Sequence, residues 1–213
     1  MSQVGMDFIF IMILKVKKIS CSRGYRQLFG DLSFELRAGQ LLLVEGENGS
    51  GKSTLLKIIS GLRRPDDGEV TWNGDEIDSL ASLYSQQIVW LSHRNGINTS
   101  LTAKENIQVA ANLAKSKIKN LSSILARVGL EGYENTTVRQ FSAGMKRRLA
   151  LSRLLLNKAT LWILDEPQTA LDKAGMQLLE ELIEHHVKND GMVIMSSHHS
   201  VQFKTIPVGR LAL

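Results

Sequence analysis

The stretch that decides the fold reads Gly46-Glu47-Asn48-Gly49-Ser50-Gly51-Lys52-Ser53. It fits the phosphate-binding pattern G-x-x-x-x-G-K-[ST] at every fixed position. Glycine has no Cβ, so the backbone can curl until successive N–H groups converge on phosphate oxygens. Lys52 is expected to reach the β- and γ-phosphates, and Ser53 to offer its hydroxyl to Mg²⁺, which prefers oxygen ligands. The loop and the adjoining Thr54 are therefore predicted to bind ATP with Mg²⁺.

The sequence on both sides of this loop supports the prediction. Residues 40–44 form a short apolar run, which is typical of a buried parallel strand. Residues 53–60 predict a helix that Gly61 ends, so bound phosphates would face the positive end of a helix. The alternative is a glycine-rich turn without a ligand. The coincidence of a strand, a complete motif and a helix argues against that alternative.

Length, composition and charge restrict the class of protein. A chain of 213 residues, 43% hydrophobic and 22% charged, is typical of one globular domain, with or without an inserted lobe. Cys21 is the single cysteine, so an internal disulfide is excluded. The net charge is +5, but the basic residues are scattered and no aromatics are interleaved among them. This pattern favours a polyphosphate ligand or an anionic membrane surface, and we expect no nucleic-acid partner.

Periodicity places further strands and helices along the chain. Strands are predicted where apolar and polar residues alternate or where apolar residues run together, at residues 13–20, 32–36, 69–72, 88–91, 160–164 and 192–195. A helix is predicted to begin at Thr102, where Thr102 and Glu105 form a capping box, and further helices at residues 117–128, 142–156 and 176–187. The longest apolar run, residues 8–14, is too short to span a membrane.

These elements predict an α/β fold. We expect a P-loop NTPase core with a mostly parallel sheet, a small antiparallel β subdomain at its start and an inserted helical lobe. The whole chain would be a single domain, with residues 1–92 and 157–213 as the nucleotide-binding core and residues 93–156 as the lobe.

A second ATPase motif lies at Asp165-Glu166, directly after the apolar run of residues 161–164. Ligands of open α/β sheets bind at the carboxyl ends of the strands, where these carboxylates are expected. Asp165 is predicted to hold Mg²⁺ and Glu166 to act as the general base on water. Successive strand side chains point in opposite directions, which suits two different roles.

Together these motifs resemble the ATP-binding subunits of ABC transporters over nearly the whole chain. Residues 141–145, Phe-Ser-Ala-Gly-Met, are similar to the signature LSGGQ of that family, matching at Ser142 and Gly144 and departing at the other three positions. A helix start capped by Ser142 makes an anion site. The resemblance implies that Ser142, Ala143 and Gly144 bind the γ-phosphate held by another subunit, in a head-to-tail homodimer that sandwiches two ATP molecules.

The resemblance also bears on four further positions. Asp172 belongs to a loop that links the two sites across the dimer, and His198 matches the histidine that contacts the γ-phosphate and orients the water, with His199 as the adjacent alternative. His93 stands where most members carry a glutamine and would be a weaker ligand for Mg²⁺. Arg23 falls where an aromatic side chain usually stacks on adenine, with Tyr25 two residues on.

Where the chain departs from the general family pattern, it is similar to the haem exporter ATP-binding subunits of cytochrome c maturation. The segments concerned are residues 142–148, 162–167 and 93–97. This implies an ATPase, peripheral at the cytoplasmic face of the inner membrane, that serves integral membrane subunits. ATP hydrolysis would support haem export or release of a haem-loaded chaperone. The alternatives are an ABC transporter for another substrate, a soluble ABC ATPase of DNA repair or translation, and a P-loop small-molecule kinase.

Overall fold

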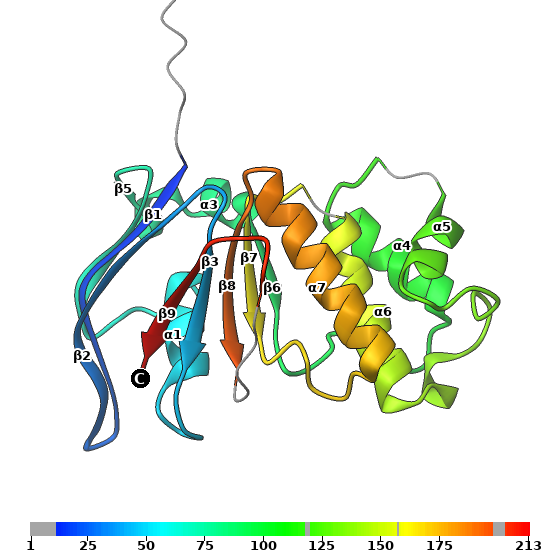
Figure 1. Cartoon of the computed structure of the whole chain (residues 1–213), viewed down its shortest axis with the longest axis horizontal. Helices are drawn as coiled ribbons and strands as arrows, with labels where there is room; N and C mark the ends of the chain where they lie inside the picture. The colour runs from blue at the N-terminus through cyan, green and yellow to red at the C-terminus, as the bar shows by residue number, and fades with distance from the viewer. Residues whose placement is uncertain (1–11, 118–119, 157, 198–202) are drawn as a thin grey trace, which may run out of the picture.

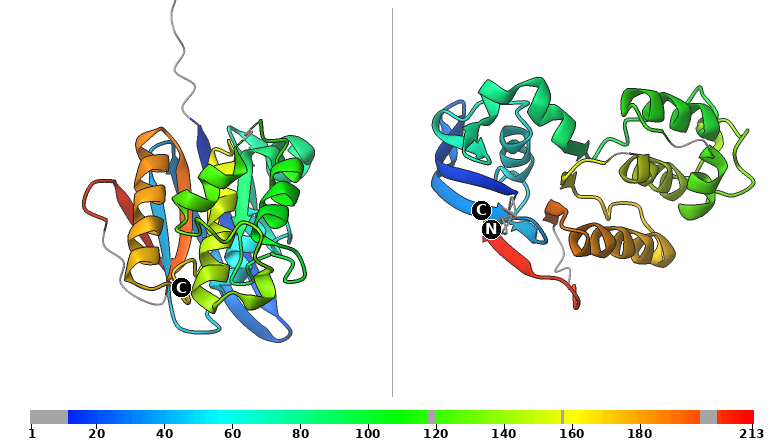
Figure 2. Two further views of the ribbon diagram at one scale, coloured as in Figure 1. Left: turned by 90° about the vertical axis from the view of Figure 1, so that its right-hand side faces the viewer. Right: turned by 90° about the horizontal axis from the view of Figure 1, so that it is seen from above.

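The computed structural model describes residues 12–117, 120–156, 158–197 and 203–213. Two sheets and α1 lie on one side of the molecule, and a group of helices lies on the other (Figure 1). Seen from above, the helices α4 to α6 stand beside the sheets as a separate group (Figure 2). The predicted α/β class, with a parallel sheet and a small antiparallel sheet, is confirmed.

The larger sheet has the strand order β6-β7-β8-β3-β9, and every pair in it is parallel. Its strands are β3 (Leu41–Glu45), β6 (Ile88–Leu91), β7 (Leu161–Asp165), β8 (Met192–Ser197) and β9 (Val208–Ala212). Because all strands run the same way, their carboxyl ends meet at one edge of the sheet. That edge receives both the phosphate loop and the Asp165-Glu166 turn.

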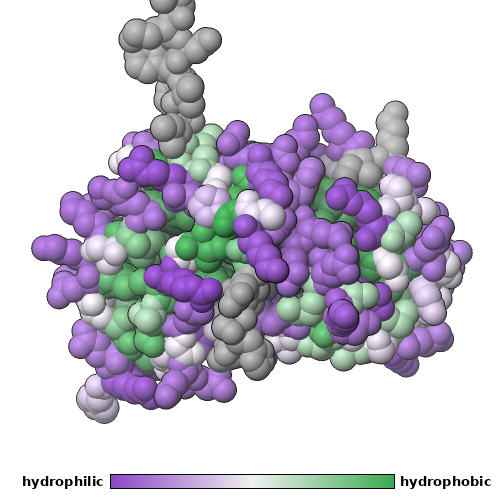
Figure 3. All heavy atoms as spheres, in the orientation of Figure 1, coloured by the Kyte–Doolittle hydropathy of each residue, from purple (hydrophilic) through white to green (hydrophobic). Residues whose placement is uncertain are grey.

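Both faces of the parallel sheet are covered, which explains why its strands are continuous apolar runs. Leu42, Val44 and Ile163 face α1 (Lys52–Ile59) and the antiparallel sheet. Leu43 and Leu164 face α6 (Ala143–Leu156) and α7 (Lys173–Lys188). With the apolar side chains buried in this way, most of the surface seen in Figure 3 is hydrophilic.

The smaller sheet is antiparallel, with the order β2-β1-β4-β5. Its strands are β1 (Ile13–Arg23), β2 (Arg26–Arg37), β4 (Asp67–Trp72) and β5 (Asp75–Glu76). Asn73 and Gly74, between β4 and β5, both have positive φ, 54° and 97°, as a two-residue hairpin turn requires. Alternate residues of β1 are buried against α1, in agreement with the alternation in the sequence.

The helical lobe has its own apolar cluster, built by α4 (Ala103–Leu113), α5 (Leu121–Arg127) and α6. The predicted capping box is present: Thr102 Oγ1 accepts from the Glu105 N–H and the Glu105 carboxylate accepts from the Thr102 N–H. The predicted start of the next helix at Lys117 is wrong. Asn120 caps α5 through its side chain, and Lys117 is not helical. Part of the predicted segment, residues 118–119, lies outside the described residues.

Some elements were missed by the sequence analysis, namely β9 and the short helices α2 (Ile77–Leu80) and α3 (Ser82–Gln87). Among the described strands, β9 pairs only with β3. It lies half exposed at the sheet edge, so it carries neither a continuous apolar run nor a strict alternation. Within the described ranges, no helix is both long and apolar enough to cross a membrane.

Candidate functional site

The phosphate loop connects β3 to α1, and its glycines adopt conformations that other residues rarely do. Gly49 and Gly51 have φ of 83° and 112°. A Cβ on Gly51 would also lie 3.1 Å from the Phe29 ring and 3.2 Å from Leu28 Cβ, so this glycine lets β2 pack closely against the loop. The first residues of α1, Lys52 and Ser53, line a cavity together with these two glycines, and the start of a helix suits an anion.

Lys52 is the first residue of α1 and is only 5% exposed. Its ammonium donates hydrogen bonds to the Gly46 carbonyl at 2.7 Å and to the Glu47 carbonyl at 2.9 Å. These bonds hold the charge at the centre of the loop. A buried ammonium at that point attracts an anion more strongly than an exposed one, because solvent screens it less.

The loop and the carboxylate turn line one cavity of about 260 Å³. The cavity is lined by Arg23, Leu28, Asn48, Gly49, Gly51, Lys52, Ser53, Thr54 and Glu166. Glu166 and Lys52 therefore line the same cavity, although they are 114 positions apart in the sequence. Of the two candidates for the base stack, Arg23 lines the cavity, whereas Tyr25 is fully exposed at the β1–β2 turn.

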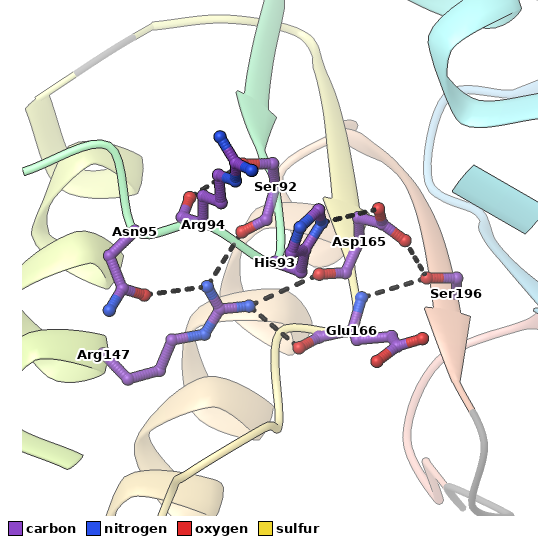
Figure 4. A network of polar contacts seen from close by, with 8 residues as sticks. All are labelled: Ser92, His93, Arg94, Asn95, Arg147, Asp165, Glu166 and Ser196. Atoms are coloured by element: carbon purple, nitrogen blue, oxygen red, sulfur yellow. Dashed lines mark hydrogen bonds and ion pairs between the residues drawn. The ribbon is translucent and has the colours of Figure 1, made fainter. Parts of the chain in front are cut away.

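Asp165 and Glu166 lie at the carboxyl end of β7, beside β8 (Figure 4). Asp165 is 1% exposed, and its Oδ1 accepts a hydrogen bond from Ser196 Oγ at 2.7 Å. The same Ser196 Oγ accepts from the Glu166 N–H at 2.9 Å. Ser196 therefore aligns both residues, a role that the sequence analysis missed.

The expected reason for the different directions of the two carboxylates was wrong. The strand ends at Asp165, and Glu166 adopts a left-handed conformation with φ of 49°. That conformation costs a non-glycine residue about 1–2 kcal/mol. This turn of the backbone, and not strand alternation, directs the Glu166 side chain toward the cavity.

His93 lies in the turn after β6, and its Nδ1 is 3.7 Å from Asp165 Oδ2. The side chain of His93 is 61% exposed, in contrast to the buried Asp165. The role of His93 as a weaker Mg²⁺ ligand stays a prediction. Among the described residues, no group of three or more His, Cys, Asp or Glu side chains forms a metal cluster without ATP.

The signature segment lies at the start of α6, where Ser142 Oγ accepts from the Met145 N–H at 3.2 Å. Ser142 and Ala143 are exposed, and a Cβ on Gly144 would lie 3.1 Å from the Ala170 carbonyl. None of these three residues lines the cavity of Lys52, and Figure 1 shows the start of α6 far from the phosphate loop. The fold of one chain therefore does not bring the signature to its own ATP site.

Asp172 caps α7, because its Oδ1 accepts from the Gly175 N–H at 2.8 Å. This local role accounts for an aspartate at the start of a helix. His198 and His199 lie outside the described residues.

Comparisons with known proteins agree with the fold and the motifs. The sequence profile of the ABC transporter family matches residues 29–169. The chain is 42% identical to the cytochrome c biogenesis ATP-binding export protein CcmA of Nitrosomonas europaea, over 95% of this chain and 96% of that protein. It is 45% identical to the protein of the same name from Methylococcus capsulatus, over 87% of this chain and 91% of that protein.

A solved structure supports the fold independently. A putative ABC transporter ATP-binding protein from Pyrococcus furiosus superposes with a TM-score of 0.81 at 24% identity, covering 94% of this chain and 97% of that one. The chain belongs to the ABC transporter family and, within it, to the ATP-binding export proteins of cytochrome c biogenesis.

Proposed function

We propose that this chain is the ATP-hydrolysing subunit of an ABC exporter for cytochrome c biogenesis, which couples hydrolysis to haem export or to release of a haem-loaded chaperone. The proposal of ATP hydrolysis rests on the cavity that Lys52 and Glu166 both line. The cytochrome c part is supported by the relatives at 42% and 45% identity, whose names state that role.

The proposed chemistry assigns a task to each part of the site. The loop of residues 46–54 binds the phosphates, with Lys52 neutralising charge. Glu166 accepts the proton of the attacking water, and His198 orients that water. Ser53 and Asp165 would hold Mg²⁺, with His93 close by; the buried Asp165 carboxylate and the Ser53 hydroxyl are hard oxygen donors that suit the ion. Mg²⁺ would supply charge stabilisation at the phosphates.

The chain is proposed to act as a head-to-tail homodimer. Ser142, Ala143 and Gly144 form an exposed helix start that is absent from the cavity of their own chain. A second copy would bring this anion site to the γ-phosphate, with Asp172 in the linking loop. Residues 1–92 and 157–213 would form the nucleotide-binding core and residues 93–156 the lobe that carries the signature.

Membrane subunits are proposed to bind in a groove between the core and the lobe. A hollow of about 450 Å³ lies between β6 and α4 and includes Val109 and Leu113. A neighbouring hollow of about 810 Å³ shares Leu113 and carries Lys115 and Lys158. Leu113 is 82% exposed, which is unusual for a leucine. An apolar partner segment with acidic flanks would fit this groove. The chain is proposed to act as a peripheral subunit at the cytoplasmic face of the inner membrane.

The docking proposal predicts the effect of a charge at the groove. Leu113→Asp is expected to reduce co-purification with the membrane subunits at least about tenfold, because it buries a carboxylate against an apolar segment. ATP binding by the purified chain should stay within about twofold of wild type, since the groove is remote from Lys52. Leu62→Asp is the matched control, because Leu62 is also exposed, 68%, but lies after α1. Equal capture of both variants would exclude the groove as the contact.

The transported substrate is tested in cells. In a bacterium that lacks its own subunit of this kind, the chain expressed with its membrane subunits should restore haem-stained c-type cytochromes, and Glu166→Gln should not. Restored transport of another compound without any change in c-type cytochromes would favour the alternative of an ABC transporter for a different substrate. Capture of soluble partners alone would favour a non-transport ABC ATPase.

A further inference from the structure

Arg147 is a buried cation for which the mechanism above has no task. It lies in the second turn of α6, just after the signature segment, and is 2% exposed. Burial lowers the pKa of its guanidinium to about 10, while the nearby Asp165 and Glu166 act in the opposite direction. At neutral pH the group therefore stays charged in the interior. A buried charge of this kind requires a specific set of partners.

The five N–H groups of Arg147 all have acceptors, and these come from two turns at the edge of the parallel sheet. Figure 4 shows these contacts except the one to Pro167. In the turn after β6, Nη1 donates to the Ser92 carbonyl at 2.9 Å and to Asn95 Oδ1 at 3.1 Å. In the turn after β7, Nε donates to the Pro167 carbonyl at 2.9 Å. Nη2 donates to the Glu166 carbonyl at 2.8 Å and the Asp165 carbonyl at 3.4 Å.

This set of contacts clamps the peptide that carries the proposed base. The Glu166 carbonyl is held by Arg147, and the Glu166 N–H is held by Ser196 Oγ. Between these two anchors the residue keeps its left-handed φ of 49°, a conformation that persists only where the surroundings impose it. Without the guanidinium, the turn would relax and carry the Glu166 carboxylate away from the cavity.

The same side chain joins three functional segments. Its backbone belongs to α6, which follows Ser142. Two of its acceptors lie in the turn that contains His93, and the other three are the carbonyls of residues 165–167. A guanidinium has a planar fork with five donors, whereas a lysine ammonium has three donors and no fixed plane. Charge alone would therefore not reproduce this link.

We propose that Arg147 is a positioning residue for hydrolysis: it holds the Glu166 turn in its active conformation and fixes the signature helix and the His93 turn relative to it. The proposal rests on the proposed role of Glu166 as the base. Arg147 contacts neither Lys52 nor the phosphate loop through any of its five bonds, so it should affect the chemical step much more than ATP binding.

Arg147→Met tests the proposal in the full chain assembled with its membrane subunits. We expect kcat to fall about 10- to 100-fold, since small misplacements of a catalytic group have effects of that size. KM for ATP, and the Kd of a fluorescent ATP analogue, should stay within about threefold of wild type. Arg147→Lys should also be impaired, because it keeps the charge but loses the fork. Recovery of wild-type kcat in Arg147→Lys would overturn the positioning role.

Arg148→Met is the matched control. Arg148 is the next residue of the same helix, but its guanidinium lies against Gly129 in the lobe. Its kcat should stay within about threefold of wild type. A similar loss of kcat in both methionine variants, or parallel losses of kcat and ATP affinity in Arg147→Met, would reduce Arg147 to a structural residue.

Combination with Glu166→Gln shows whether Arg147 acts through the base. If it does, adding Arg147→Met should lower the residual rate of Glu166→Gln by less than about twofold, because residues that act as a unit are not additive. Independent, multiplying losses would contradict the proposal. Normal turnover by Glu166→Gln alone would instead overturn the base assignment of the proposed function.

Ser196→Ala provides a second route if Arg147→Met does not fold. It removes the anchor at the Glu166 N–H with the loss of one oxygen atom. The same pattern is expected, with a fall in kcat of about 10-fold or more and little change in ATP affinity. Unchanged kcat in Ser196→Ala would contradict the need for a clamped Glu166 turn.

Discussion

Glu166→Gln is expected to lower kcat by roughly 10²- to 10⁴-fold, the usual contribution of a general base. Glutamine has nearly the same shape, so the left-handed turn and the cavity should remain, but a neutral amide cannot take the proton of water. ATP affinity should stay close to wild type, because the phosphates are bound by the loop and Lys52. Steady-state phosphate release and the Kd of a fluorescent ATP analogue measure the two effects separately.

The same variant tests the proposed homodimer. When hydrolysis is slow, the state in which each signature segment covers the partner's ATP should persist. Size-exclusion chromatography with light scattering should then show twice the monomer mass for Glu166→Gln with MgATP, and the monomer mass without ATP. Glu131→Gln, which changes an exposed glutamate in the lobe, is the control and should behave like wild type. Full turnover by Glu166→Gln, or full activity in a demonstrably monomeric wild type, would contradict the mechanism.

Lys52→Ala is expected to weaken ATP binding about 10- to 100-fold. Hydrogen bonds from a charged group contribute about 1.5–3 kcal/mol, and each 1.4 kcal/mol is a factor of ten. The loop would also lose the bonds that the ammonium donates to the Gly46 and Glu47 carbonyls, so it would be less well ordered for phosphate. Isothermal titration with MgATP measures the change, beside a thermal melt that checks folding.

Lys57→Ala is the matched control for this experiment. Lys57 lies on the same helix, but its side chain is exposed and its loss should leave ATP affinity within about twofold. Lys52→Arg keeps the charge, but a planar guanidinium is not a point charge and does not reproduce the bonds of the ammonium to the Gly46 and Glu47 carbonyls, so binding should stay impaired. Normal ATP affinity in Lys52→Ala would count against the phosphate-loop assignment.

Local chemistry explains why much of this protein could be predicted. The glycines of the phosphate loop, the apolar run before Asp165 and the capping box at Thr102 each act over a few residues, so the sequence alone predicts a strand, a turn or a helix start there. The parallel core followed from the alternation of apolar runs with helices. The edge strand β9 could not be predicted in this way. Its pairing with β3 at the sheet edge leaves it half exposed, so its residues show no clear pattern.

The motifs were enough to predict a phosphate-binding loop, to find the two carboxylates that follow a buried strand and to identify the family that the chain resembles. Only the tertiary structure decided how Glu166 is aimed, because its left-handed turn depends on Arg147 and Ser196, which are 19 and 30 residues away. Only the tertiary structure separated the signature from the cavity of its own chain. Contacts between distant segments leave no periodic trace in a sequence, and they decide the geometry on which catalysis depends.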